Sequence, residues 1–300
     1  MDPVNTKPYQ LPAQAVWLIT GCSSGIGRAL ATLIASRPRQ RLIATARKLT
    51  DLSYLSDDDP DILKLVLDVT SPTSVNGAFA SVEEKLGKDT NIDVVVNNAG
   101  YSLSGDTEAA TEEETHREIE TLFFGTARVT MQAVRVMRQS KNHQGGIIFN
   151  ISSLAGVCGF AGHAYYHAGK FAVEGFSESV AREMHPDWNI NFCIVEPSGV
   201  RTNFEGHSKA RIQPHPAYAA EDMPSRKLEK YVERGLKSGM LIEPSAIADS
   251  IYHIASRGEC VPLRLPLGAA AWGLSKAKHE GALQGLDAVK EMSLFTKKLN

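Results

Sequence analysis

Short runs of Val, Ile and Leu alternate along this chain with longer segments of amphipathic pattern, and no other feature constrains the fold as strongly. Six such runs predict strands, which cover residues 15–19, 41–45, 62–67, 92–96, 146–151 and 191–195. The longer segments predict helices, which cover residues up to 36, 72–86, 111–139, 163–184 and 244–256. Nearly continuous apolar strands are typical of a sheet covered by helices on both faces. The alternation therefore predicts an α/β fold with a doubly wound parallel sheet and right-handed crossovers.

The 300 residues are expected to form a single domain with a tail, a lid and an extension. The tail covers residues 1–12, the domain 13–260 and the C-terminal extension 261–300. Between about 203 and 239 the pattern becomes polar and contains three prolines. Because this segment follows the sixth strand, at the edge where such sheets bind ligands, it is interpreted as a substrate lid. A solvated surface helix is the alternative.

Composition excludes several other classes of protein. The formal net charge of −2 offers no basic excess for nucleic acid, and the 43% hydrophobic content supplies a sizeable core. The four cysteines form no CxxC pair, and the polar start carries no apolar signal segment, so a cytoplasmic protein is expected. The apolar stretch 261–274 contains Arg264 and two prolines, so no transmembrane segment is expected, although a peripheral membrane contact stays open.

A glycine-rich loop, Thr20–Gly27, follows the first predicted strand and opens a helix. Gly21 permits a tight turn, Gly25 lets the backbone approach a ligand, and Gly27 lets the helix pack on the strand. Amide groups at the helix N-terminus then face a pyrophosphate. The alternative is a plain strand–helix turn, but the placement between strand and helix favours a dinucleotide site.

Residues after the next strands indicate which dinucleotide binds. Ala46 stands where an acidic reader of a ribose 2′-hydroxyl is expected, and Arg47 follows it. Because arginine suits a 2′-phosphate, NADP(H) is favoured over NAD(H), with a plain surface arginine as the alternative. Asp68 is expected to accept a hydrogen bond from the adenine amino group. The small residues of Asn97–Gly100 let the backbone pass close to a nucleoside.

Ser153, Tyr166 and Lys170 form a candidate acid–base group. Tyr166 and Lys170 are four residues apart and share one helix face, while Ser153 follows the fifth predicted strand. A free tyrosine has a pKa of about 10, and lowering it by about three units needs roughly 4 kcal/mol. A nearby lysine cation favours the phenolate, so Lys170 is expected to lower the Tyr166 pKa. Ser153 is placed to hydrogen-bond a carbonyl or alcohol oxygen.

These motifs together resemble the short-chain dehydrogenase/reductase family over about residues 13–256. The resemblance implies a Rossmann-type domain, a homodimer or homotetramer, and direct hydride transfer that needs no metal. Tyr166 is then the general acid in reduction and the base in oxidation, Lys170 binds the nicotinamide ribose, and Ser153 orients the substrate oxygen. The cofactor-binding residues that it implies are Gly21, Ser23, Ser24, Gly25, Ile26, Gly27, Arg47, Asp68, Asn98, Tyr166, Lys170 and Thr202.

Two positions depart from the family pattern. Leu122 stands where many members carry an asparagine thought to hold a water in the proton relay from the lysine, and leucine cannot hydrogen-bond. Ser198 replaces a glycine that usually follows the proline of the segment Glu196–Thr202. His163 or His167 could join the relay, but a packed or surface histidine is the favoured interpretation. The histidines of the lid, including His207, lack metal-ligand spacing, and its basic residues are interpreted as a solvated face.

The leading hypothesis is an NADP(H)-dependent oxidoreductase that interconverts a ketone and a secondary alcohol. A lipid, sterol-like or polyketide-like substrate of medium size and largely apolar character is expected by analogy. A non-redox isomerase, cyclase or epimerase on the same scaffold is the alternative, and Leu122 keeps it open. A non-enzymatic nucleotide sensor or scaffold protein is a third hypothesis, which the intact catalytic triplet disfavours.

Overall fold

Seven parallel strands form the central sheet of the computed structural model, which describes residues 4–87, 91–139, 145–202, 209–237 and 241–295. Their order is β3-β2-β1-β4-β6-β7-β9. The strands are β1 (Val16–Ile19), β2 (Arg41–Ala46), β3 (Ile62–Val66), β4 (Val94–Asn97), β6 (Gly146–Ile151), β7 (Ile190–Pro197) and β9 (Arg264–Leu267). The order reverses between β1 and β4, which confirms the doubly wound, Rossmann-type sheet in one domain.

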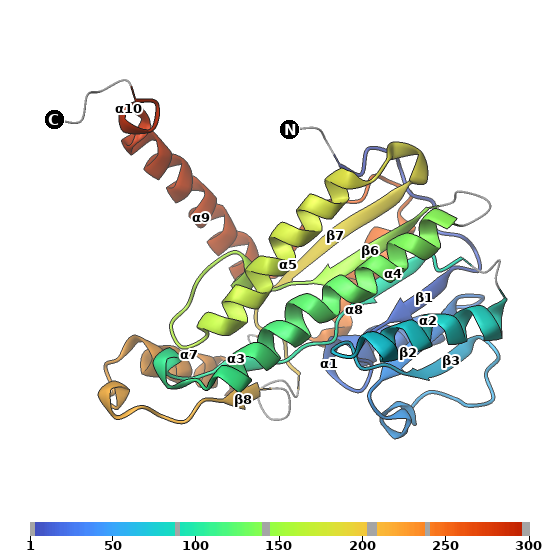
Figure 1. Cartoon of the computed structure of the whole chain (residues 1–300), viewed down its shortest axis with the longest axis horizontal. Helices are drawn as coiled ribbons and strands as arrows, with labels where there is room; N and C mark the ends of the chain where they lie inside the picture. Colours follow the sequence, from blue (N-terminus) through green and yellow to red (C-terminus); the bar gives the residue numbers. More distant parts are fainter. Residues whose placement is uncertain (1–3, 88–90, 140–144, 203–208, 238–240, 296–300) are drawn as a thin grey trace.

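Helices cover both faces of this sheet (Figure 1). One face carries α1 (Gly25–Ala35) and α8 (Pro244–Ser256), and the other carries α2 (Pro72–Leu86), α4 (Gly125–Gln139) and α5 (Ala164–Glu183). Successive strand residues point to opposite faces, so Ile148 and Phe149 of β6 enter two different hydrophobic cores and both are fully buried. Burial on both sides explains why the strands read as continuous apolar runs.

The long helix predicted over residues 111–139 is interrupted. It begins as α3 (Glu112–Ile119), whose first turn is held by a capping box between Thr111 and Glu114. A π-helical turn, Glu120–Phe124, follows and leads into α4. A π turn adds a residue to one helical turn, so the side chains before and after it do not follow one 3.6-residue repeat. Leu122 lies inside this turn.

The seventh strand, β9, was not predicted, so the sheet continues to Leu267 instead of ending before the extension at residue 261. β9 is an edge strand that pairs with β7 and contains Pro266, which an edge tolerates and a central strand does not. Its first residue, Arg264, forms ion pairs with Glu174 and Glu178 of α5 at 3.3 and 2.7 Å. Beyond β9 the extension is helical and forms α9 (Ala269–Ala288) and α10 (Lys290–Ser293).

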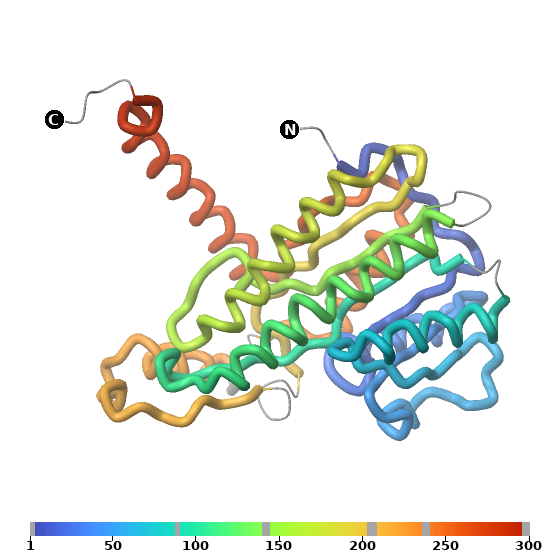
Figure 2. The backbone as a smooth tube through the Cα atoms, viewed as in Figure 1, coloured from blue at the N-terminus to red at the C-terminus, as the bar shows by residue number. Residues whose placement is uncertain are grey.

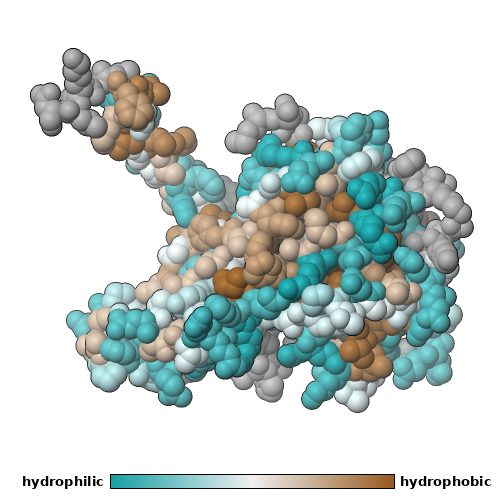
Figure 3. Space-filling view, in the orientation of Figure 1, coloured by the Kyte–Doolittle hydropathy of each residue, from teal (hydrophilic) through white to brown (hydrophobic). Residues whose placement is uncertain are grey.

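Helices α9 and α10 project away from the domain, as the tube in Figure 2 shows. Within the described residues, no helix combines the length and apolar content needed to cross a bilayer. Figure 3 shows apolar side chains gathered on the outer face of α4 and α5, where Phe124, Met131 and Phe171 are exposed. The expected homo-oligomer and the cytoplasmic location remain predictions.

The described part of the lid pairs with a short strand that follows β4. Strand β5 (Ser102–Ser104) pairs in parallel with β8 (Lys209–Arg211), and helix α7 (Pro224–Lys237) follows. Figure 2 shows this segment passing beside α3 at one end of the sheet. Residues 203–208 and 238–240 of the expected lid, including Phe204 and His207, lie outside the described residues. The movement of the lid remains a prediction.

The N-terminal segment packs against the domain from its first described residues. The Asn5 side chain donates to the carbonyls of Phe192 and Val261 at 2.7 and 2.9 Å, and accepts from the Phe192 amide at 3.0 Å. Asn5 takes a left-handed backbone with φ +54°, which asparagine tolerates better than most residues. Tyr9 is 2% exposed. Residues 4–12 therefore stabilise the amino edge of the sheet.

Replacing this anchor tests the contribution of the segment. Asn5→Ala is expected to lower the free energy of unfolding by about 2–4 kcal/mol, because it removes three hydrogen bonds and places a Cβ-bearing residue in the left-handed region. The exposed neighbour supplies the control, and Thr6→Ala is expected to change stability by less than about 0.5 kcal/mol. Urea unfolding followed by circular dichroism measures both. Equal stabilities of the two variants would contradict the anchoring role.

Candidate active site

The candidate residues meet at the carboxyl edge of the sheet. The glycine loop follows β1, Asn98 follows β4, Ser153 follows β6 and Thr202 lies after β7. Tyr166 and Lys170 lie in the first turns of α5, which begins beyond Ser153. Parallel strands place all their carboxyl ends at one edge, so residues far apart in the sequence converge there.

Ser153, Tyr166 and Lys170 contact one another as the spacing predicts. Ser153 and Tyr166 are joined by a side-chain hydrogen bond, and Ser153 Oγ also accepts from the Ala155 amide at 3.1 Å. Lys170 Nζ lies 5.8 Å from the centre of the Tyr166 ring and donates to the Ile151 carbonyl at 2.7 Å. The carbonyl at the end of β6 therefore fixes the lysine beneath the phenol.

The expected lowering of the Tyr166 pKa is not found in the protein alone. Burial raises the Tyr166 pKa to about 12; the Ser153 hydrogen bond lowers it and the Glu118 carboxyl raises it. Burial also lowers the Lys170 pKa to about 8, against the attraction of Glu118 and Glu174. The sequence argument considered the attraction between the lysine cation and the phenolate, and not the burial of the phenol. In the fold both groups are desolvated, and desolvation disfavours both charged forms.

Glu118 is a functional candidate that the sequence analysis missed. It is fully buried at the end of α3, and its Oε1 accepts from the Leu103 amide of β5 at 3.1 Å. Burial raises its pKa to about 7, opposed by the Leu103 amide, the Lys170 charge and the Tyr101 hydroxyl. One signal was available: Glu118 lies four residues before Leu122, so the two share a helix face.

The glycine loop is tied to the end of β4 by side-chain hydrogen bonds. Thr20 Oγ1 accepts from the amides of Asn98 and Ala99 at 2.9 and 3.0 Å. In return, the Asn98 side chain donates to the carbonyls of Thr20 and Gly21 at 2.9 and 3.1 Å. A Cβ on Gly27 would lie 2.4 Å from both Asn98 Nδ2 and the Gly21 carbonyl oxygen, so only glycine fits there.

The loop has the features that a pyrophosphate site requires. Gly21 and Gly25 have φ of +71° and +57°, which glycine adopts without strain. Ser24 is the N-cap residue of α1, but its side chain makes no capping hydrogen bond. No acidic residue occupies the first turn either, so the helix N-terminus can face an anion. A Cβ on Gly25 would lie 3.2 Å from Thr202 Cγ2, which places Thr202 across the loop. Ser23 and Ile26 are half-buried here.

Arg47 and Asp68 follow β2 and β3, the strands beside β1. Arg47 is exposed and has no ion-pair partner among the described residues. Asp68 is half-buried, and its Oδ1 accepts from the amide and hydroxyl of Thr70 at 2.9 and 2.7 Å. These contacts fix the Asp68 carboxylate at the sheet edge. The residues present therefore fit a phosphorylated dinucleotide lying across the ends of β1, β2 and β3.

A buried polar network beneath the site was also missed. Asn97 Nδ2 donates to Thr130 of α4 and to Asn150 of β6 at 2.9 and 2.7 Å. Asn150 Nδ2 in turn donates to Ser177 of α5 at 2.7 Å. Buried amides need such partners, so the network fixes α4 and α5 relative to the sheet. Only the fold brings these positions together.

The histidines near Tyr166 make structural contacts. His167 Nε2 accepts from the Phe160 amide at 2.9 Å, so the ring is neutral and its Nδ1 donates to the Ala155 carbonyl at 2.7 Å. Burial lowers the His167 pKa. The packed interpretation therefore fits His167, while His163 Nδ1 lies 3.2 Å from the Ala161 carbonyl. The described residues contain no cluster of three or more His, Cys, Asp or Glu side chains suited to a metal.

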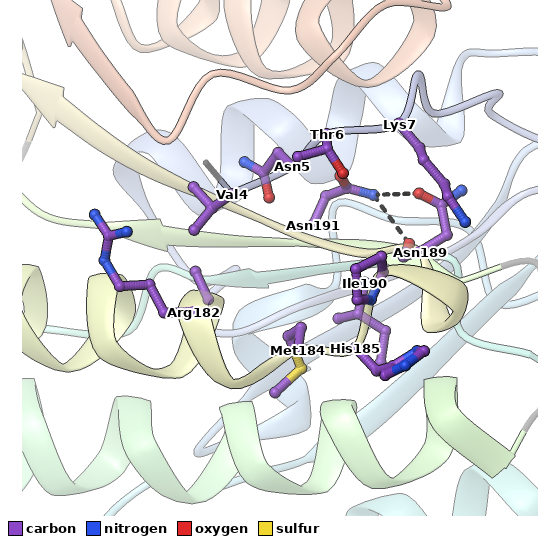
Figure 4. A pocket seen from close by; sticks show the side chains of 12 residues that line it. Val4, Asn5, Thr6, Lys7, Arg182, Met184, His185, Asn189, Ile190 and Asn191 are labelled. Carbon is purple, nitrogen blue, oxygen red and sulfur yellow. Dashed lines mark hydrogen bonds between the residues drawn. The ribbon is translucent and has the colours of Figure 1, made fainter. Parts of the chain in front are cut away.

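Two cavities lie near the molecular surface. One of about 580 Å³ lies between the β5 loop and the lid, and its lining includes Asp106, Ile212 and Arg226. The other, of about 320 Å³, lies at the amino edge beside Asn5 and Asn191 (Figure 4). Because parallel sheets bind ligands at their carboxyl edge, only the first cavity belongs near the site.

Three basic residues in the described part of the lid are paired with acidic ones. Arg226 contacts the buried Asp106 at 2.5 Å, which anchors α7 to the loop after β5. Lys230 contacts Glu221 at 2.8 Å, and Arg211 lies 3.8 Å from Glu229. These pairs favour the solvated-face interpretation over recognition of an acidic substrate.

Comparison with known proteins identifies the class to which this fold and site belong. The family model described as short chain dehydrogenase matches residues 15–213, more than half of the chain. A solved short-chain dehydrogenase from Streptomyces avermitilis is 33% identical, with a TM-score of 0.82, covering 94% of this chain and all of that one. The protein is a member of the short-chain dehydrogenase/reductase family, whose enzymes are oxidoreductases that use nicotinamide cofactors.

Two curated relatives refine the comparison. The oxidoreductase calM of Penicillium decumbens is 65% identical over 293 residues, covering 98% of this chain and 96% of that protein. A 3-ketodihydrosphingosine reductase of Bacteroides thetaiotaomicron is 38% identical over 187 residues, covering 62% of this chain and 64% of that protein.

The glycine cradle can be tested by a matched pair of substitutions. Gly27→Ala is expected to weaken NADPH binding about tenfold or more and to lower the free energy of unfolding by about 1–3 kcal/mol, because its Cβ meets the Gly21 backbone. Gly77→Ala is the control, because nothing lies within 4 Å of its Cβ, and it is expected to stabilise α2 by about 0.5–1 kcal/mol. Fluorescence titration and urea unfolding measure the two effects. Tight NADPH binding by Gly27→Ala would argue against the cradle.

Proposed function

We propose that this protein is an NADP(H)-dependent oxidoreductase that interconverts a ketone and a secondary alcohol. The observation that carries the proposal is the convergence of Ser153, Tyr166 and Lys170 beside the glycine cradle at one edge of the sheet. A proton donor and a hydrogen-bonding hydroxyl next to a dinucleotide site are what carbonyl reduction requires.

In this proposal the chain's residues orient the substrate and move a proton, while the bound nicotinamide supplies the hydride. Ser153 and Tyr166 donate hydrogen bonds to the substrate oxygen, and Tyr166 Oη gives its proton as the alkoxide develops. Because burial keeps the Tyr166 pKa at about 12, the phenol is protonated at neutral pH. This is the form that ketone reduction needs from its proton donor.

The proposed substrate is medium-sized and largely apolar, with lipid-like, sterol-like or polyketide-like chemistry. The 580 Å³ cavity beside the lid supports the size, because it suits a small organic molecule, and Ile212, Pro214 and Pro216 give apolar surface to a lining that also holds the Asp106–Arg226 pair. The 3-ketodihydrosphingosine reductase is a relative whose name denotes a long-chain ketone. The paired charges of the lid leave little free charge for an ionic substrate.

Removing the phenol hydroxyl tests the catalytic assignment. Tyr166→Phe is expected to lower kcat by about 100-fold or more, because it removes the proton donor, while NADPH affinity stays within about twofold. Tyr165→Phe is the matched control, because residue 169, one turn on, is glycine and no lysine supports that phenol. Consumption of NADPH against a panel of apolar ketones, with product mass, is the measurement. Near-normal turnover by Tyr166→Phe would contradict the assignment of Tyr166 as the proton donor.

The choice of cofactor depends on Arg47. Arg47→Ser is expected to lower kcat/KM for NADPH by about 10- to 100-fold and to leave that for NADH unchanged, because a charge-assisted bond to the 2′-phosphate contributes about 1.5–3 kcal/mol. Lys85→Ser, an exposed change on α2, controls for loss of surface charge. Initial rates at varied cofactor concentration give both ratios. A parallel loss with both cofactors would show that Arg47 does not read the phosphate.

A further inference from the structure

Lys170 must exchange protons with solvent once per turnover if Tyr166 is the acid, yet Lys170 is only 7% exposed. Its Nζ donates to the Ile151 carbonyl, and no carboxylate among the described residues lies within ion-pair distance of it. Leu122 of the π-helical turn occupies a position where a hydrogen-bonding side chain could hold a water for this proton exchange. Cβ atoms on Gly100 and Gly169 would lie 2.8 and 2.9 Å from Leu122. Leu122 therefore fills the space beside the lysine with apolar atoms.

Glu118 lies on the same helix face one turn before Leu122, and α3 packs against α5. The Glu118 side chain is fully buried, and only Oε1 has a normal hydrogen bond, from the Leu103 amide. Oε2 is buried and accepts no hydrogen bond of ordinary length among the described residues, while the Tyr101 hydroxyl lies near enough to lower the pKa of the carboxyl. A buried carboxyl oxygen left without a partner is costly, and such atoms in native proteins call for a functional or solvent-based explanation.

Charged and polar groups surround the Glu118 carboxyl. Lys170 lowers the pKa of Glu118, and Glu118 raises the pKa of Lys170, so the two groups attract each other across more than an ion-pair distance. The half-buried Tyr101 also interacts with the carboxyl, and Arg117 and Glu114 act on the phenol of Tyr101. Lys170 Nζ also lies 5.8 Å from the centre of the Tyr166 ring, and Glu174 raises the Lys170 pKa. Glu118 therefore interacts with both the buried Lys170 and the half-buried Tyr101.

The pKa values of Glu118 and Lys170 are similar. Burial raises the pKa of Glu118 to about 7 and lowers that of Lys170 to about 8. Ordinary values differ by about six units, so burial has removed most of that gap. A proton passes most readily between groups of similar pKa, since neither direction then has a large cost.

We propose that Glu118 is a proton-relay residue that reprotonates Lys170, which rests on the proposed function of Tyr166 as the acid. After Tyr166 Oη gives its proton to the substrate oxygen, an N–H bond of Lys170 breaks and its proton reprotonates the phenolate. The O–H bond of Glu118 then breaks, and its proton passes to the lysine amine through one bridging water. The carboxylate takes a new proton from solvent by way of the Tyr101 hydroxyl, and oxidation of the alcohol runs the same steps in reverse. Glu118 acts through Lys170 and touches no reacting atom, so it is a positioning residue.

Kinetics of the full-length protein test the relay. Glu118→Gln keeps the acceptor for the Leu103 amide but cannot exchange a proton, so kcat is expected to fall about tenfold or more while KM is unchanged and the solvent deuterium isotope effect on kcat rises. Adding Leu122→Asn to that variant is expected to restore most of kcat, because an amide there can hold a water beside Lys170. Glu112→Gln, on the exposed face of α3, is the control. Unchanged kcat and an unchanged pH profile in Glu118→Gln would overturn the relay.

A second measurement needs no turnover. Carbon-13 NMR of protein labelled at glutamate carboxyls is expected to show a resonance, absent in Glu118→Gln, that titrates near neutral pH. Lys170→Met keeps the packing volume but removes the cation, so the titration midpoint of Glu118 is expected to rise. If the titration midpoint of Glu118 is the same in Lys170→Met as in the wild type, the inference is overturned. If no carbonyl compound is reduced by the wild type, the proposed function fails while this titration still decides whether the pair exists. If the wild type and Glu118→Gln turn over alike, only the relay fails.

Discussion

The tie between the ends of β1 and β4 is the interaction on which the site depends. Four hydrogen bonds join Thr20 and Gly21 to Asn98 and Ala99 across the point where the strand order reverses, which closes the glycine loop against β4. Gly27 must lack a side chain because this closure leaves no room for one. The loop is thereby held open towards the carboxyl edge, where its amides can face an anion, and the neighbouring strand ends set the positions of the remaining site residues.

Burial of the ionisable side chains is the second constraint, because it decides which protonation states they favour. Lys170, Tyr166 and Glu118 converge in a desolvated space, where each neutral form is favoured. The fold compensates with single hydrogen bonds: the Ile151 carbonyl for Lys170, the Ser153 hydroxyl for Tyr166 and the Leu103 amide for Glu118. A protonated phenol above a partly charged lysine suits proton donation. The same burial creates the problem of returning a proton to Lys170.

Most of the fold was predictable because strand and helix periodicity is a local property. The six predicted strands and the helix boundaries of α2 and α8 follow from apolar runs, from the Ser71 cap and from proline at the first helical turn. The strand β9 was missed because Arg264 and Pro266 interrupt the apolar stretch that contains it. The π-helical turn was missed because its extra residue is set by packing of Leu122 and Gly125 against distant elements. Neither feature has a local pattern.

The sequence by itself determined the family and pointed to the members of the candidate catalytic triplet and of the glycine cradle. These depend on fixed spacings: four residues along a helix face, or three glycines in one strand–helix turn. The tertiary structure alone decided the electrostatics. It buried Tyr166, which reversed the expected direction of the Tyr166 pKa, held His167 between two backbone groups, and brought Glu118 of α3 beside α5. Desolvation depends on what surrounds a group in space, and no spacing along the chain encodes it.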